Sequence, residues 1–416
     1  MRTEIISIGS ELLHGEVLDS NAQHISAALS QIGLQVMQIT VVPDEIEAIV
    51  EALAATKQRS CKIVITTGGL GPTSDDVTKE ALAKYLDCPA VVFSKERLSN
   101  LGAVDTPVIQ YLERATNSSV NISDLQCGGI NNLLGTASGI YCKQGNQILI
   151  ALPGVPTEMQ AMLRYTVLPY LQSNFTLPSF YQKTICTIGI SEEEIATILA
   201  LWESQLPAPI KLAYLPDLAT VKIKLAATVS TWEESKRLVE EEFLRALPLI
   251  KPYVYGYNTD TIEEVIGSLL KSQEKSLAVA ESCSGGYVSQ LIIQVPGSST
   301  YYQGGIVAYN NTVKHKVLGV AENTLLQYGA VSQETAMEMA QNVRLKLKAD
   351  IGLATTGIAG PGGGTIEHPV GTVWAAYADE NTCYAQKLQL NNNRLYNIQL
   401  TAYHLLDLLR KKLQSK

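Results

Sequence analysis

Residues 276–295 read SLAVAESCSGGYVSQLIIQV. The apolar run at residues 276–280 predicts a buried strand, and the spacing of apolar residues from Gly286 onward predicts a helix over residues 286–295. At such a junction, free backbone N–H groups and the positive end of the helix dipole can stabilise negative charge. This stretch therefore predicts an α/β fold with a candidate site, including an oxyanion hole, where the strand gives way to the helix.

The same alternation of strands and helices continues on both sides of this stretch. It predicts an α/β carboxy-terminal domain over residues 261–416, a small α+β domain over residues 180–256 and an α/β amino-terminal domain over residues 1–172. In the first domain, strands at 4–8, 36–41, 62–66 and 147–151 alternate with helices at 21–32, 45–56, 77–86 and 157–171, which predicts a parallel sheet covered by helices. Residues 117–146, rich in Asn, Gly and Ser, are predicted to be irregular.

Composition narrows the class of protein. The formal net charge of −8 and the lack of a long basic run argue against nucleic acid as a partner. No stretch approaches the roughly 18 apolar residues that span a membrane, and the start of the chain has no secretory signal pattern. The seven cysteines are scattered without a Cys-x-x-Cys pair, which is typical of reduced thiols in the cytoplasm. We expect a soluble, cytoplasmic protein that acts on a small molecule.

Two side chains suggest nucleophilic chemistry in the carboxy-terminal domain. Ser282 lies at the strand-to-helix junction, where a serine either caps the helix or acts as a nucleophile. Lys314 is predicted in the first turn of another helix, where the helix dipole and partial burial would lower its pKa, as a serine-activating base requires. A surface lysine is the alternative interpretation of Lys314.

A glycine-dense segment, residues 355–365, follows a strand in the same domain. Its backbone could approach a phosphate group closely, and Arg394 could add a bidentate contact. It lacks the Gly-Lys-Ser/Thr ending of a P-loop, and a flexible surface loop is the alternative.

A similar segment, residues 66–76, occurs in the amino-terminal domain. Its glycines suit phosphate, and the adjacent Asp75 and Asp76 suit a hard divalent cation. The alternative is that both aspartates only complement the dipole at the start of a helix.

Six ordered motifs give the carboxy-terminal domain a close resemblance to a known family. They are AESCSGG (280–286), PGSS (296–299), VAYNNxxK (307–314), GAVS (329–332), TGIAGPGGG (356–364) and HPVGTV (368–373). Together they resemble the CinA carboxy-terminal domain, whose family includes nicotinamide mononucleotide deamidases. The resemblance implies an amidohydrolase that converts nicotinamide mononucleotide to nicotinic acid mononucleotide and ammonia, without a cofactor or metal.

The resemblance also implies site residues. Ser282 would be the nucleophile and Lys314 its base, with Tyr309 orienting the lysine or lining the pocket. Cys283 is a chemically stronger nucleophile, but the family motif gives that role to the preceding serine. The implied substrate-binding residues are Cys283, Ser284, Gly285, Gly286, Thr356, Gly357, Gly360 and Arg394. Residues 392–394 read Asn-Asn-Arg and are followed by Ile398, where the family usually has Gly-Asp-Arg and a second arginine.

The amino-terminal domain, through residues 9–15, Asn21 and residues 152–158, resembles the CinA amino-terminal domain, which is similar to molybdopterin-binding proteins. That resemblance implies metal-dependent cleavage of a diphosphate such as ADP-ribose. Gly68, Gly69, Gly71, Thr73 and Gly154 would hold phosphates, and Asp75, Asp76 and Glu158 a divalent metal ion, with Glu11 a weaker candidate. The family's Asn-x-x-Gln-Ala stretch is not recognisable in residues 107–121.

Residues 180–256 resemble the KH-like linker domain of longer family members but lack its Gly-x-x-Gly, so we expect a spacer or dimer contact. The family resemblance implies a homodimer. Two other hypotheses compete with a deamidase: a non-catalytic nucleotide-binding or competence accessory protein, and a protein with only the amino-terminal activity.

Overall fold

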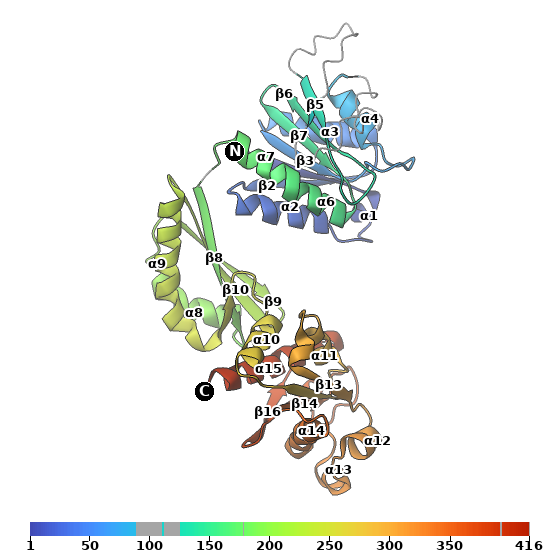
Figure 1. Cartoon of the computed structure of the whole chain (residues 1–416), viewed down its shortest axis with the longest axis vertical. Coiled ribbons are helices and arrows are strands. Elements are labelled where there is room, and N and C mark those ends of the chain that lie inside the picture. The colour runs from blue at the N-terminus through green and yellow to red at the C-terminus, as the bar shows by residue number, and fades with distance from the viewer. Residues whose placement is uncertain (89–109, 112–124, 178, 392, 416) are drawn as a thin grey trace. The chain divides into compact units, whose positions relative to one another are not determined.

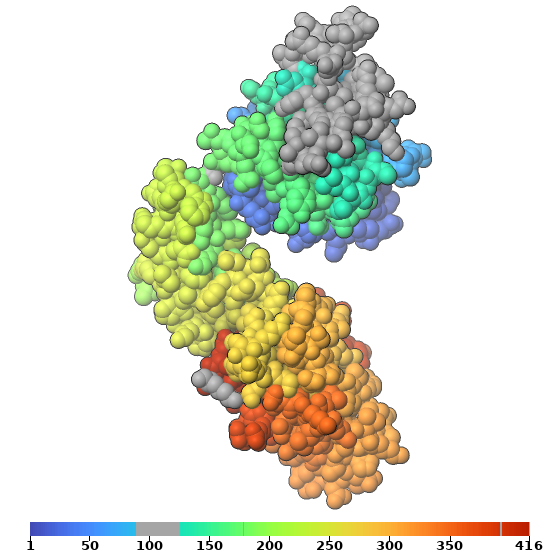
Figure 2. All heavy atoms as spheres, in the orientation of Figure 1, coloured from blue at the N-terminus to red at the C-terminus, as the bar shows by residue number. Residues whose placement is uncertain are grey.

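The computed structural model describes the whole chain except residues 89–109, 112–124, 178, 392 and 416. The chain divides into two compact units, Met1–Tyr181 with Thr228–Ser235, and Gln182–Ala227 with Lys236–Lys416. Each unit contains a strand-and-helix architecture, visible in Figure 1. Figure 2 shows all heavy atoms of the chain in the same orientation, coloured from blue at the amino terminus to red at the carboxy terminus. The predicted α/β fold class is confirmed.

The first unit is built on one sheet, which in the described residues has seven strands in the order β2-β1-β3-β7-β6-β5-β4. Strands β2, β1, β3 and β7 are parallel, whereas β6, β5 and β4 extend the sheet in antiparallel fashion. The strands are β1 (Thr3–Ile8), β2 (Val36–Val42), β3 (Ile63–Thr67), β4 (Gln110–Tyr111), β5 (Leu125–Ile130), β6 (Gly139–Gln144) and β7 (Gln147–Leu152). The helices are α1 (Ser10–Leu13), α2 (Ser20–Gln31), α3 (Ile46–Gln58), α4 (Thr78–Tyr85), α6 (Pro156–Met162), the π-helix η2 (Leu163–Val167) and α7 (Leu168–Asn174).

Helices cover both faces of this sheet because its central strands are apolar on both faces. Ile6 and Val64 pack with α3 and α4, whereas their neighbours Ile5 and Ile65 pack with α2 and α6. Continuous burial along β1, β3 and β7 follows from this two-sided packing, which is typical of parallel strands.

The prediction that residues 117–146 are irregular is wrong for the hairpin of β5 and β6. These strands pair antiparallel with Cys127 opposite Cys142. The glycines at 128 and 129 lie inside β5, where they weaken the strand signal, and the polar residues that suggested a loop form the turn between the strands. The sequence pattern also predicts no strand at residues 254–257 or 383–389, where the structure has β11 (Val254–Tyr257) and β16 (Cys383–Gln389).

The second unit contains two sheets. In the smaller sheet the strand order is β11-β8-β10-β9, with β9 and β10 forming a hairpin. Its elements are β8 (Ser179–Ile188), α8 (Glu192–Glu203), β9 (Ile210–Asp217), β10 (Thr220–Val229), α9 (Trp232–Ile250), the 3-10 helix η3 (Lys251–Tyr253) and β11 (Val254–Tyr257). The first residues of β8 and the end of β10 belong to the first unit.

The larger sheet of the second unit carries the candidate site, and its strand order is β13-β12-β14-β15-β16. Strands β13, β12 and β14 are parallel, and β15 and β16 are antiparallel to their neighbours. Helices α10, α11 and α15 pack on one face and α14 on the other. The strands are β12 (Leu277–Glu281), β13 (Tyr302–Val307), β14 (Ile351–Gly357), β15 (Thr372–Ala378) and β16 (Cys383–Gln389). The helices are α10 (Ile262–Ser272), α11 (Tyr287–Ile293), η4 (Ser298–Thr300), α12 (Asn311–Val313), the π-helix η5 (Lys314–Leu318), α13 (Glu322–Tyr328), α14 (Gln333–Lys346) and α15 (Arg394–Gln414).

The two sheets of the second unit share a hydrophobic core. Cys186, Ile188 and Tyr255 of the smaller sheet are buried in the same cluster as α10 and α15. The buried Arg410 of α15 pairs with Asp407 and donates hydrogen bonds to the carbonyl oxygens of residues 252 and 254. Most of the predicted α+β domain therefore packs with the carboxy-terminal part. The boundaries of the three predicted domains stay a prediction.

Candidate active site

The candidate site of the second unit lies at one edge of the larger sheet. Ser282 directly follows β12, Ala308 and Tyr309 follow β13, and Gly357 ends β14. Since these three strands are parallel and adjacent, their carboxyl ends meet at this edge, where α/β proteins commonly bind ligands. The backbone N–H of Ala308 donates to the carbonyl oxygen of Glu281, and that of Ser282 to Thr355, which ties the three strand ends together.

The structure brings the predicted nucleophile and base into contact. The Nζ of Lys314 lies 2.9 Å from the Oγ of Ser282. Both side chains are buried, with relative exposures of 2% and 6%. Two further hydrogen bonds run from Nζ to the carbonyl oxygens of Ala308 at 2.9 Å and Tyr309 at 3.2 Å. A lysine amine with three defined partners has a fixed position relative to the serine hydroxyl.

Local structure explains why the lysine points back at the strand end. The side chain of Asn310 accepts from the N–H of Thr312 and so caps the short helix α12. Lys314 follows it as the first residue of η5, and its N–H donates to the carbonyl oxygen of Asn310. Its side chain therefore turns toward the residues just before the helix, as helical side chains generally do.

Burial lowers the pKa of Lys314, with the neighbouring Cys283 as a smaller opposing influence. The physical cause is that an ammonium ion loses hydration in the interior, which favours the neutral amine. From the sequence, both partial burial and the positive end of a helix are expected to lower the pKa of Lys314. In the structure, burial is the main cause of the lowered pKa.

Glu281 is a functional candidate that the sequence reasoning missed. Its carboxylate is fully buried and accepts hydrogen bonds from the N–H groups of Gly286, Val288 and Ser289 and from the Oγ of Ser289, at 2.6–3.1 Å. It thereby satisfies the start of α11 and fixes the turn that contains Ser282. The sequence offers one signal for this role of Glu281. It lies five residues before Gly286, the N-cap of α11.

This contact corrects the expected location of the oxyanion hole. In the first turn of α11, the N–H groups of Val288 and Ser289 donate to Glu281 and that of Tyr287 donates to the carbonyl oxygen of Ser284, so none of these three is left free. Within the part of the chain that the structure describes, the backbone N–H groups of Cys283 and Ser284, which directly follow Ser282, donate no hydrogen bond to another residue. These two groups are the donors available to a negatively charged oxygen near Ser282.

The remaining residues of the turn have structural partners. The thiol of Cys283 is buried, which raises its pKa to about 12, so a thiolate is disfavoured there. The hydroxyl of Ser284 shares a hydrogen bond of 2.6 Å with Thr355. Gly285 and Gly286 have φ of +62° and +104°, a region that strongly favours glycine.

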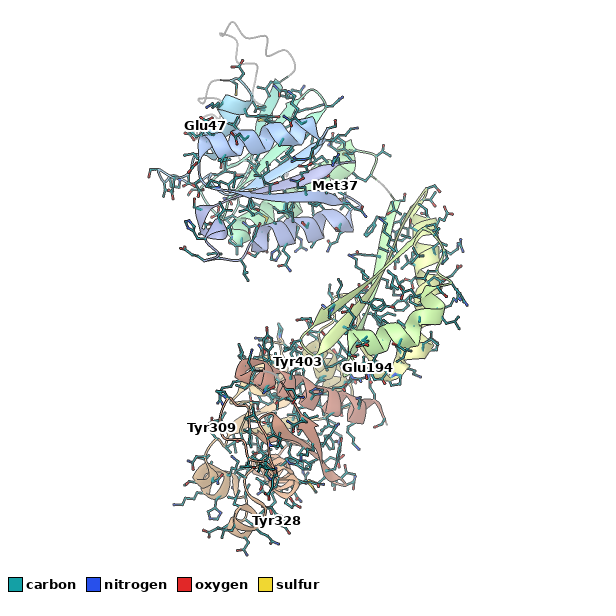
Figure 3. All side chains as sticks on the ribbon, turned by 180° about the vertical axis from the view of Figure 1, so that it is seen from behind. Met37, Glu47, Glu194, Tyr309, Tyr328 and Tyr403 are labelled. Atoms are coloured by element: carbon teal, nitrogen blue, oxygen red, sulfur yellow. The ribbon has the colours of Figure 1, made fainter. Side chains whose placement is uncertain are left out.

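Tyr309 and Arg394 connect the other two loops at the site. Arg394 donates to the carbonyl oxygen of Gly360 at 2.5 Å and to the hydroxyl of Tyr309 at 3.1 Å. The ring of Tyr309 is 61% exposed and lies at the surface of its unit in Figure 3. The carbonyl oxygen of Tyr309, and not its side chain, contacts Lys314. The structure thus places the predicted arginine beside the glycine-dense loop.

The residues at the start of that loop are closely packed. The hydroxyl of the buried Thr356 donates to the carbonyl oxygen of Ala330. A Cβ at Gly357 would meet the carbonyl oxygen of Thr372 at 2.6 Å, and Gly360 has φ of +91°. Thr356 and Gly357 therefore shape the end of β14, Gly360 is buried, and the loop is exposed over residues 361–367.

The glycines predicted in the first unit also lie at the carboxyl edge of parallel strands. Gly68 and Gly69 follow β3, and a Cβ at Gly68 would meet the carbonyl oxygen of Ile8 at 2.1 Å. Gly154 follows β7, and its carbonyl oxygen accepts from the side chain of Asn21. The structure therefore brings the loops after β1, β3 and β7 together.

The predicted carboxylates of this unit have other partners. Asp76 accepts from the N–H and hydroxyl of Thr73. Partial burial opposes the charge of Asp76, but these bonds and one from the N–H of Gly71 outweigh it and lower its pKa. Asp75 is exposed.

The side chain of Glu158 accepts from Asn132 at 2.6 Å and lies against Gly135. Glu11 lies against Gly9, in the loop after β1. In the described part of the chain, no three His, Cys, Asp or Glu side chains form a group that could hold a metal ion. The three predicted metal ligands therefore do not fit a preformed divalent-cation site in this structure. Of residues 107–121, only 110 and 111 are described, and Asn392 also lies outside the described residues.

None of the helices in the described ranges is both long enough and apolar enough to cross a membrane.

Comparisons with known proteins cover both units. Residues 259–413 match the family model for the CinA C-terminal domain, and residues 4–173 match that for a probable molybdopterin binding domain. A CinA-like protein of Amoebophilus asiaticus (strain 5a2) is 90% identical over 416 residues, which is 100% of each chain. A CinA-like protein of Cytophaga hutchinsonii is 41% identical over 413 residues, which is 99% of this chain and 98% of that protein.

Among solved structures, the competence/damage inducible protein CihA from Agrobacterium tumefaciens is 33% identical to this chain and covers 36% of it and 91% of its own length, with a TM-score of 0.35. The relatives from Amoebophilus asiaticus and Cytophaga hutchinsonii match 100% and 99% of this chain. The chain therefore belongs to the family of CinA-like proteins, with a CinA carboxy-terminal domain and a molybdopterin-binding-like amino-terminal domain.

Proposed function

We propose that this protein is an amidohydrolase that removes ammonia from the carboxamide of a pyridine nucleotide, with nicotinamide mononucleotide as the substrate. The observation that carries the proposal is the buried contact of 2.9 Å between Lys314 Nζ and Ser282 Oγ. A surface lysine or a helix-capping serine would not require this arrangement. The resemblance of the surrounding motifs to a family with deamidase members supports the choice of substrate.

The contacts of Lys314 define how it would act as a base. In its neutral form, two N–H groups donate to the carbonyl oxygens of Ala308 and Tyr309, at 2.9 and 3.2 Å. The remaining lone pair then faces the hydroxyl of Ser282. As Ser282 Oγ forms a bond to the carboxamide carbon, its proton passes to Nζ, and the carbonyl π-electrons move to the oxygen.

The backbone supplies the matching donors. The free N–H groups of Cys283 and Ser284 would bind the oxyanion of the tetrahedral intermediate. Lys314 then returns the proton to the amide nitrogen, the C–N bond breaks, and ammonia leaves an ester on Ser282. Water adds to this ester with Lys314 again as base, and breakage of the bond to Oγ releases the carboxylate product and restores the serine.

The loop cluster of Arg394, Tyr309 and Gly360 supports a phosphorylated substrate. The guanidinium uses two of its N–H groups on Gly360 and Tyr309, so others remain for the phosphate of a nucleotide. For the first unit, the partners of Asp76 and Glu158 argue against a preformed metal centre, and we propose no diphosphate cleavage there.

Removal of either reacting group should strongly reduce turnover. We expect Ser282→Ala to reduce ammonia release from nicotinamide mononucleotide roughly a thousandfold or more, and Lys314→Met roughly 100- to 10,000-fold, the usual contribution of a general base. A coupled ammonia assay on the purified variants measures both. Circular dichroism verifies that they remain folded.

Cys283→Ala is the matched control, because the adjacent thiol is buried and its pKa is raised to about 12. It should keep activity within a few fold of the unchanged protein. Full activity of Ser282→Ala would contradict the proposal, and substrate binding without any turnover by the unchanged protein would favour the accessory role instead.

Activity should rise with pH on the acidic side of the profile. Lys314 accepts a proton only when neutral, so kcat/KM should increase as the pH rises through the pKa of Lys314 in the free enzyme. Because burial lowers that pKa below its usual value of 10.5, the curve should level off below pH 10.5. If kcat/KM instead falls as the pH rises toward 10.5, a neutral lysine is excluded as the base.

Arg394→Ala should separate binding of the phosphate from chemistry at the carboxamide. We expect KM for nicotinamide mononucleotide to rise at least about tenfold, the effect of losing roughly 1.4 kcal/mol of a charged hydrogen bond, with a much smaller change in kcat. With nicotinamide riboside, which lacks the phosphate, the variant and the unchanged protein should differ little. If Arg394→Ala reduces kcat/KM equally for nicotinamide mononucleotide and nicotinamide riboside, Arg394 has a structural role and does not bind the phosphate.

A further inference from the structure

In the first unit, Cys127 and Cys142 form a buried pair that the proposed function does not use. They are directly opposite each other in the β5–β6 hairpin, and their sulfur atoms are 2.6 Å apart. Both side chains belong to the apolar cluster between this sheet and helices α3 and α4. The two thiols are thus held together by the register of the sheet and shielded from solvent.

The geometry suits a covalent bond. Opposite residues of antiparallel strands have Cα atoms about 4.5–5.5 Å apart, and a disulfide spans about 4.4–6.8 Å. The register of the hairpin, with Cys127 directly opposite Cys142, therefore already places the two side chains where a disulfide can form. Small side-chain rotations are therefore sufficient to close it, without a change of strand register.

Other uses of the pair have less support. Within the described residues, no group of three potential ligands is present that would make these thiols part of a metal site. Burial raises the pKa of the Cys142 thiol. This argues against a thiolate that persists in the resting protein, as a metal ligand or a catalytic nucleophile requires, whereas the oxidation described below needs each thiol to lose its proton only as it reacts. Cys61, in the same cluster, differs because its sulfur donates to the carbonyl oxygens of Arg2 and Ile63.

We propose that Cys127 and Cys142 are a redox modification site, which forms a reversible cross-strand disulfide when the protein meets a peroxide. Both cysteines are free thiols in the structure, which corresponds to the reduced state.

The chemistry is a two-electron oxidation. The sulfur of Cys127 attacks one oxygen of hydrogen peroxide, the O–O bond breaks, and water leaves a sulfenic acid on Cys127. The sulfur of Cys142 then attacks that of Cys127, an S–S bond forms, and the sulfenic oxygen departs as a second water. The two thiols together lose two protons and two electrons, and the peroxide becomes two molecules of water.

The disulfide would stabilise a hairpin that touches the candidate site of the first unit. The turn between β5 and β6 carries Asn132, which donates to Glu158 in α6, and Gly135, which lies against the same carboxylate. A cross-link at the base of this turn restricts the unfolded chain, the usual origin of disulfide stabilisation.

Peptide mapping of the full chain tests the proposal. The reduced protein is treated with hydrogen peroxide, denatured, alkylated at free thiols and cleaved with chymotrypsin, which can cut between the two cysteines. We expect a linked pair of peptides containing Cys127 and Cys142 that dithiothreitol separates, while Cys61 stays alkylated. In addition, the thermal transition of the first unit should shift upward by roughly 5–10 °C.

Cys142→Ser provides the matched variant. It should give no linked peptides, and Cys127 should be trapped by dimedone as the sulfenic acid that lacks its partner. The proposal is overturned if both cysteines of the unchanged protein remain alkylated after peroxide treatment, or if Cys127 links to Cys88 instead. Ser282 takes no part in this reaction, so failure of either proposal leaves the other unaffected.

Discussion

The candidate site depends on one constraint, a lysine amine enclosed at the edge of a parallel sheet. Lys314 can be buried because two backbone carbonyl groups and the Ser282 hydroxyl accept its hydrogen bonds, and burying an amine without such partners would be costly. The same burial lowers its pKa. Packing that would destabilise a charged amine therefore favours the neutral amine, which is the form that the proposed base requires.

The fold provides this enclosure through its strand order. Strands β13, β12 and β14 are neighbours and parallel, so the loops carrying Lys314, Ser282 and the glycine-dense segment emerge side by side. Glu281 then fixes the turn after β12 by accepting the N–H groups at the start of α11. Because its carboxylate occupies the N–H groups of Gly286, Val288 and Ser289, the backbone donors left beside Ser282 are those of Cys283 and Ser284.

The sequence was sufficient to predict what depends on local pattern. Apolar periodicity predicted most strands and helices, and the family resemblance implied that Ser282 and Lys314 act together, which agrees with their contact in the structure. Sequence patterns did not predict features that depend on strand register or on hydrogen-bond partners distant in the chain. The hairpin of β5 and β6 was missed because glycines interrupt it, and with it the pairing of Cys127 with Cys142. For Asp76, the hydrogen bonds from Thr73 are contacts that only the folded turn reveals, and its role as a metal ligand stays a prediction.

The central claim is that Ser282 becomes covalently attached to the substrate through chemistry assisted by Lys314. Rapid mixing of the protein with nicotinamide mononucleotide, an acid quench within the first turnovers and peptide mass spectrometry would test it directly. The account predicts a nicotinate mononucleotide ester on the peptide that contains Ser282, lost on longer incubation before the quench as water hydrolyses it. Product formation with the acyl group on Cys283, or with no adduct on Ser282 at any time while ammonia is released in a burst, would contradict it.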